Sequence, residues 1–297
     1  MARRWQWFHR LGSPPGFYRA SGYWLPWLAV AAALLLGVGL VWGLVYAPPD
    51  ARQGNSFRII YIHVPVSFLA LAGYYVMAVA GAVHLIWRMK LADMVMTAAA
   101  PLGAALTFVA LFSGAVWGKP TWGTYWVWDA RITSMLVLLF LYLGVVALRQ
   151  GFSNREAAGR ACAVLALVGT VNIPIIYKSV DWWYSLHQPA TIRLTAAPSM
   201  HPDMFKPLLV MILGLYVFYA LVLILNTRAE ILARERRTGW VRELAMGRNQ
   251  DLIRSFTVLP NFSPWAVTDP MSGVPTALPW WCWSGWSCSR CAGTRPS

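Results

Sequence analysis

Histidine is the residue with the clearest potential for chemistry in this chain, and three of its five histidines lie in segments between long apolar runs. These are His63, His187 and His201. A neutral imidazole is a good iron ligand, and two imidazoles from opposite faces make a six-coordinate haem. His63 and His187 come from different segments, so they can approach a flat ligand such as haem from opposite faces. We interpret His201, between Pro198 and Pro202, as a hydrated polar residue.

An aromatic-rich segment, residues 117–134, lies between the two candidate ligands in the sequence. Trp and Tyr also gather at membrane–water interfaces, but five aromatic residues in twelve, within a single link, indicate a wall for a flat apolar ligand. If this link were helical, Trp122, Tyr125, Trp126 and Asp129 would share one face. The expected wall residues are Trp117, Trp122, Tyr125, Trp126 and Trp128.

Asp129 follows these aromatic residues and directly precedes an apolar run. Its simplest role is that of a helix N-cap that accepts a hydrogen bond from the amide of Arg131 or Ile132, and it can shape the binding site as well. A haem also needs cations for its two propionates. The sequence does not choose between the candidates, which are Arg58, Lys119, Arg131 and Arg193.

The elements that position these residues must be membrane spans. The chain has 297 residues, of which 58% are hydrophobic and 12% charged, whereas about a quarter of the residues of soluble domains are charged. About 20 apolar residues cross a bilayer as a helix. The sequence therefore predicts an all-α polytopic membrane protein with six transmembrane helices, near residues 25–46, 62–87, 95–116, 132–148, 159–177 and 205–226.

The distribution of Lys and Arg predicts the orientation of these helices. The two termini and the second and fourth links hold 18 of the 25 Lys and Arg residues, and the other links hold seven. Basic residues accumulate in cytoplasmic segments, so both termini are predicted to be cytoplasmic. His63, His187 and the aromatic-rich link then face outward. The net charge of +14 reflects this topology and gives no reason to expect a nucleic-acid partner.

The C-terminal part of the chain differs in composition from the rest. We predict a membrane domain over residues 1–254 and a disordered tail over residues 255–297, where Pro, Ser, Gly and Trp dominate and apolar periodicity is lost. Cys282, Cys288 and Cys291 in this tail are too few for a four-ligand zinc site.

Three segments carry a specific resemblance to a known family. GNSFRIIYIHVPVSF, GKPTWGTYWVWDARITSMLVLLFLYLG and NIPIIYKSVDWWYSLHQ resemble the haem exporter protein C family (CcmC) of bacterial cytochrome c maturation, and WGTYWVWDARITS resembles its tryptophan-rich WWD signature. The resemblance covers about residues 1–250. It implies that His63 and His187 are the axial ligands of haem b, the transported ligand, and that the WWD link contacts the haem.

The resemblance also implies partners and a location. The expected site faces the periplasm from the bacterial inner membrane, within membrane lipid, and delivers haem to a periplasmic haem chaperone. The expected protein partners are ABC transporter subunits and a small membrane subunit of the same system. The chain would be a transport component and not an enzyme, which agrees with the lack of paired carboxylates, a nucleophile–base pair or a phosphate loop in the sequence.

Two other functions compete with haem delivery. A cytochrome b-like redox subunit would also bind haem, but such proteins bury their histidine pair between facing helices, whereas both histidines here lie at one predicted face. A small-solute permease would need polar residues inside the spans, and these spans contain few beyond Thr107, Ser113, Thr170 and Asn172.

Overall fold

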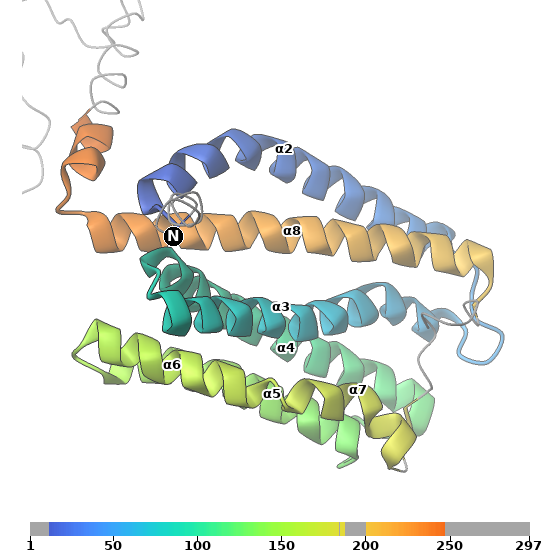
Figure 1. Cartoon of the computed structure of the whole chain (residues 1–297). Coiled ribbons are helices and arrows are strands. Elements are labelled where there is room, and N and C mark those ends of the chain that lie inside the picture. The colour runs from blue at the N-terminus through green and yellow to red at the C-terminus, as the bar shows by residue number, and fades with distance from the viewer. Residues whose placement is uncertain (1–11, 184, 188–199, 247–297) are drawn as a thin grey trace, which may run out of the picture. The chain divides into compact units, whose positions relative to one another are not determined.

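The chain folds into long helices that match the six predicted spans (Figure 1). The structure is a computed structural model and describes residues 12–183, 185–187 and 200–246. Six of its helical segments are long and apolar enough to cross a membrane, which confirms the all-α polytopic fold. The helices are α2 (Pro14–Val41) with its π-helical end η2 (Trp42–Tyr46), η3 (Asn55–Ile59) leading into α3 (Ile60–Trp87), α4 (Lys90–Trp122), α5 (Ala130–Gly151), α6 (Arg155–Gly169), α7 (Asn172–Trp182) and α8 (Pro202–Glu235).

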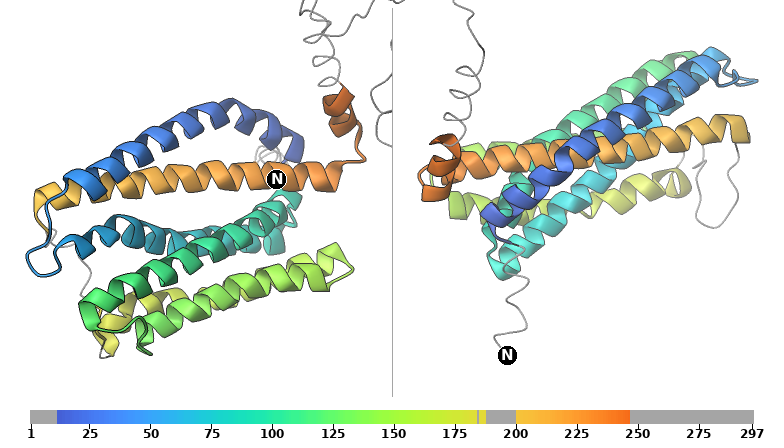
Figure 2. Two further views of the ribbon diagram at one scale, coloured as in Figure 1. Left: turned by 180° about the vertical axis from the view of Figure 1, so that it is seen from behind. Right: turned by 90° about the horizontal axis from the view of Figure 1, so that it is seen from above.

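The helices pack in three layers around a central pair, as Figures 1 and 2 show. Helices α3 and α4 form the middle layer, α2 packs along α8 on one side, and α5 packs with α6 and α7 on the other. The main core lies between α3, α4, α5 and α6, and its largest fully buried side chains include Tyr74, Met77, Leu138 and Tyr142. The outward surfaces remain apolar, as lipid requires.

Glycines in the spans allow this close packing of the helices. A Cβ atom at Gly103 of α4 would collide with the ring of Tyr142 on α5. A Cβ atom at Gly169 would collide in the same way with Tyr74 on α3. Glycine at these two positions lets a tyrosine of another helix lie against the backbone.

The fifth span is two helices, although the sequence predicted one continuous helix. Helix α6 ends at Gly169 and α7 begins at Asn172. Pro174 lies in the first turn of α7, where the missing amide hydrogen of proline costs no helical hydrogen bond, so the residue suits a helix that starts again at this point. The Asn172 side chain donates a hydrogen bond to the Ser134 carbonyl of α5 at 2.9 Å, which fixes the restart of the helix.

The third span is longer than the sequence predicted, and this corrects one expectation for the aromatic-rich link. Helix α4 continues to Trp122 and ends at Gly123, which has the left-handed conformation (φ +80°) common after helix C-termini. Residues 123–129 are not helical. The shared helical face expected for Trp122, Tyr125, Trp126 and Asp129 is therefore wrong.

The candidate site residues gather at one end of the helices (Figure 2). His63 lies in the first turn of α3, His187 follows α7, and His201 is the N-cap of α8. The loop between α4 and α5 lies at the same end, while the turns between α3 and α4 and between α5 and α6 lie at the other. The three histidines therefore share one end of the molecule. The cytoplasmic position of both termini stays a prediction.

A buried carboxylate joins three helices at the opposite end. The side chain of Asp93 on α4, 7% exposed, accepts hydrogen bonds from Arg149 on α5 and from Arg234 on α8. Thr97, one turn further along α4, accepts another from Arg234 at 3.0 Å. This ion-pair cluster fixes α4 against both neighbouring helices.

We expect Asp93→Ala to destabilise the fold by about 3 kcal/mol, because two partly buried guanidinium groups would lose their carboxylate. Thermal unfolding of the purified protein in detergent measures the loss. Glu156→Ala is the matched control, since the Glu156–Arg160 ion pair is exposed and contributes little. Equal melting temperatures for the two variants would contradict the structural role of Asp93.

Candidate functional site

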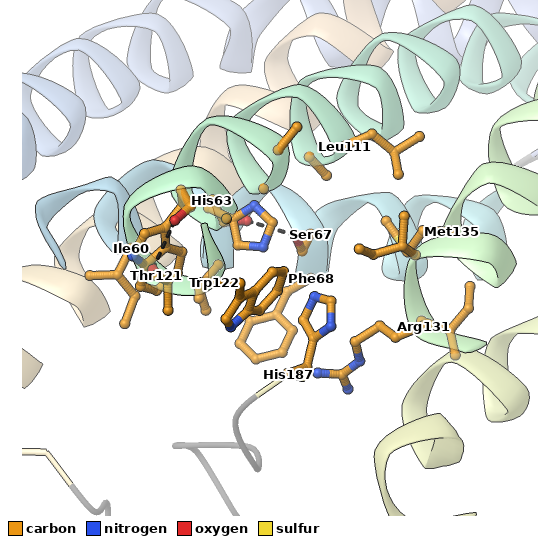
Figure 3. Close-up of a pocket in the computed structure, with 18 of the residues that line it drawn as sticks. Ile60, His63, Ser67, Phe68, Leu111, Thr121, Trp122, Arg131, Met135 and His187 are labelled. Atoms are coloured by element: carbon orange, nitrogen blue, oxygen red, sulfur yellow. Dashed lines mark hydrogen bonds between the residues drawn. The ribbon is translucent and has the colours of Figure 1, made fainter. Parts of the chain in front are cut away.

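An apolar cavity of about 220 Å³ opens among α3, α4, α5, α7 and α8. Both predicted histidine ligands line it, and Figure 3 shows both rings close to Trp122, with His63 above the indole and His187 beside it. The lining residues that the sequence predicted are His63, His187, Trp117, Trp122, Tyr125, Trp126 and Arg131.

His63 is held by two residues of α4. Its Nδ1 atom lies 3.0 Å from the hydroxyl oxygen of Ser113, and that hydroxyl donates its own hydrogen to the Val109 carbonyl at 2.6 Å. The Ser113 oxygen can therefore only accept, so His63 carries its proton on Nδ1 and keeps the Nε2 lone pair free. The next residue, Gly114, provides the space, because a Cβ atom there would lie 2.9 Å from His63 Cε1.

His187 is held by Asp129. The Nδ1 atom of His187 donates to Asp129 Oδ2 at 3.0 Å, so here too the Nε2 lone pair is free. The Ser185 hydroxyl also donates to this carboxylate oxygen and accepts the His187 backbone amide at 3.1 Å. The other carboxylate oxygen accepts the Ile132 amide at 2.8 Å, which confirms the predicted N-cap.

The pairing of Asp129 with His187 has no signal in the sequence, because the two residues are 58 positions apart. The Ser113 partner of His63 escaped sequence reasoning for the same reason. Ser113 stood out only as one of few polar residues within the spans.

The charge states of the Asp129–His187 pair suit metal ligation. Burial lowers the pKa of His187 below its ordinary value and outweighs the nearby carboxylate, which raises it. Burial alone would raise the pKa of Asp129, but hydrogen bonds from Ser185, Ile132 and His187 lower it below its ordinary value. At neutral pH the carboxylate is therefore charged and the imidazole neutral, as a metal ligand must be.

Each histidine also contacts one tryptophan of α4. The His63 ring meets Trp117 edge to face at 5.7 Å between centroids, and His187 meets Trp122 in the same way at 4.8 Å. The Trp117 indole donates to the Gln53 side chain at 2.8 Å, which fixes its ring. Trp128 differs from the other predicted wall residues, because it is 74% exposed and lies outside the cavity lining.

The candidate partners for the propionates differ in whether they line the cavity. Arg131 lines the cavity, and its Nε atom is buried with no hydrogen-bond partner among the described residues. Arg58 does not line the cavity, because its guanidinium binds the carbonyls of Leu44 and Ala47 at 2.7 and 2.9 Å and caps the first span. Lys119 binds the Gly123 carbonyl at 3.0 Å. Arg193 lies outside the described residues.

A comparison with protein families matches residues 7–242 to the family described as Heme exporter protein C (CcmC). The chain belongs to this family. Heme exporter protein C of Escherichia coli (strain K12) is 48% identical over 246 residues, which cover 83% of this chain and 99% of that protein. The proteins of the same name from Haemophilus influenzae and Paracoccus denitrificans are 44% and 38% identical, over 81% and 78% of this chain and 98% and 96% of those proteins.

The hydrogen bonds predict the tautomers of three histidines. We expect ¹⁵N spectra of histidine-labelled protein at neutral pH to show Nδ1 protonated in His63 and His187. His201 is an internal control with the opposite tautomer, because its Nδ1 accepts the Asp203 amide at 3.3 Å. Protonation of Nε2 in His63 or His187 would contradict the geometry described for that residue.

Proposed function

We propose that this protein binds haem between His63 and His187 and takes part in haem handling for cytochrome c maturation. The observation that carries the proposal is the pair of neutral imidazoles lining one apolar cavity with both Nε2 lone pairs unused. Membership of a family named for haem export supports it. When bound, haem b supplies an iron with two open axial positions, and the chain supplies the two ligands.

The surroundings of the histidines suit the rest of such a ligand. Trp117, Trp122, Tyr125 and Trp126 offer apolar faces to a macrocycle, and the free Nε–H of Arg131 suits a carboxylate such as a propionate. Pockets that enclose a small ligand usually measure about 300–1,000 Å³. A cavity of about 220 Å³ would leave one edge of the haem accessible to an acceptor.

We further propose that the site faces the periplasm and that the protein delivers its haem to a periplasmic haem chaperone. The excess of Lys and Arg in the two termini and in the second and fourth links of the sequence supports this orientation. ABC transporter subunits and a small membrane subunit of the same maturation system are the other proposed partners. The proposed role is transport, in which the chain binds and orients haem. The proposed location is the bacterial inner membrane.

The alternative of a cytochrome b-like redox subunit agrees less well with the geometry. Electron transfer across a membrane needs cofactors spaced through its thickness, whereas both histidines lie at one end of the helices. One accessible haem edge at a membrane face suits transfer of the haem itself.

We expect His63→Ala and His187→Ala each to weaken haem retention by more than the ~10–100-fold that loss of an outer-shell partner costs a metal site. Haem per purified protein is measured from the visible absorption spectrum, and transfer is measured by adding the apo-chaperone. His201→Ala is the control and should keep both properties. Normal haem content and transfer in both ligand variants would refute the two-histidine site.

Removal of residues 255–297 should leave haem handling intact, because the site is built from residues before position 210. The measurement is haem content and transfer to the apo-chaperone for full-length and truncated protein at equal membrane insertion. A truncated protein that inserts normally and transfers no haem would assign a function to the tail.

A further inference from the structure

We infer that the two imidazoles are unequal iron ligands: His187, supported by the Asp129 carboxylate, binds iron more strongly, and His63, supported by the Ser113 hydroxyl, is displaced first. The inference rests on the proposed haem site. It concerns electron donation by each imidazole and the order in which the two bonds break when haem leaves.

The Asp129–His187 pair makes a strong ligand. A carboxylate that accepts the Nδ1–H bond of a metal-bound histidine raises the basicity of the ligating Nε2 atom. Asp129 is buried, and its carboxylate accepts the His187 ring, the Ser185 hydroxyl and the Ile132 amide. The hydrogen bonds from Ser185 and the Ile132 amide also hold the carboxylate in place.

The Ser113–His63 pair makes a weaker ligand. The hydroxyl oxygen is a neutral acceptor, and hydrogen bonds between neutral groups have roughly half the strength of charge-assisted ones. Ser113 therefore sets the tautomer of His63 while adding little to its basicity. The two sites otherwise match, because each imidazole donates from Nδ1 at 3.0 Å and meets one tryptophan of α4.

The placement of the two imidazole rings does not account for the inferred difference in their strength as iron ligands. His63 stands on a helix, is confined between α3 and α4, and fits against Gly114 and Trp117. His63 is therefore well positioned to orient the haem, and its weaker hydrogen-bond partner makes it the ligand that an incoming acceptor ligand displaces. His63 acts as the exchangeable ligand while His187 retains the iron.

The first test compares the two ligands directly. Full-length His63→Gly and His187→Gly proteins are loaded with haem in detergent, and the rate of haem loss to excess apo-globin is measured. We expect His187→Gly to lose haem at least fivefold faster. Added imidazole should slow the loss from both variants, because it replaces the missing ligand, and this rescue shows that both proteins are folded.

The second test measures the electronic effect of each partner through the reduction potential of the haem. Asp129→Asn should favour ferrous over ferric haem by about tenfold, a rise of about 59 mV for a one-electron couple, because a charged acceptor stabilises the ferric state. Ser113→Ala should change this preference less than threefold, and Ser113→Thr should restore the wild-type spectrum and rate of haem loss. Thr107→Val is the matched control, since Thr107 bonds the Gly103 carbonyl on the same helix and lies outside the cavity lining.

The outcomes separate the inference from the proposed function. Equal or reversed rates of haem loss, or equal shifts of potential for Asp129→Asn and Ser113→Ala, would overturn the inference while a six-coordinate wild-type spectrum upholds the haem site. A wild-type protein that takes up no haem would overturn the proposed function and, with it, the inference.

Discussion

The buried carboxylate of Asp129 is the interaction on which the candidate site depends. One of its oxygens caps the N-terminus of α5 by accepting a hydrogen bond from the Ile132 amide. The other accepts hydrogen bonds from Ser185 and His187, which follow α7. A buried charge is costly unless it is paired and hydrogen-bonded, and here three donors from two segments satisfy it: the Ile132 amide, the Ser185 hydroxyl and the His187 ring. The position of His187 and the start of α5 are therefore set by the same group.

Helix α4 is the second determinant of the site, because its residues contact both histidine rings. Ser113 and Gly114 set the tautomer and the space for the ring of His63, while Trp117 and Trp122 contact the two imidazoles. Residues on one helix keep fixed spacings, and a site built on helices is held more accurately than one built on loops. The loop of residues 123–129 then supplies Tyr125 and Trp126 to complete the lining.

The sequence predicted those features that depend on composition or on neighbouring residues. Lipid requires long apolar helices, so the six spans were visible, and the N-cap role of Asp129 followed from its place before an apolar run. Features that depend on distant partners were not visible. Nothing local pairs Asp129 with His187 or directs Arg58 to the carbonyls of Leu44 and Ala47.

The continuity of α4 has a mechanical consequence. The helix runs without interruption from the Asp93 cluster at one end to Trp122 at the other, a length of about 50 Å for its 33 residues. Asp93 ties it to α5 and α8, and its two tryptophans touch the imidazoles. The anchor at Asp93 thus sets, through one rigid helix, how far along the bundle the two tryptophans stand beside the imidazoles.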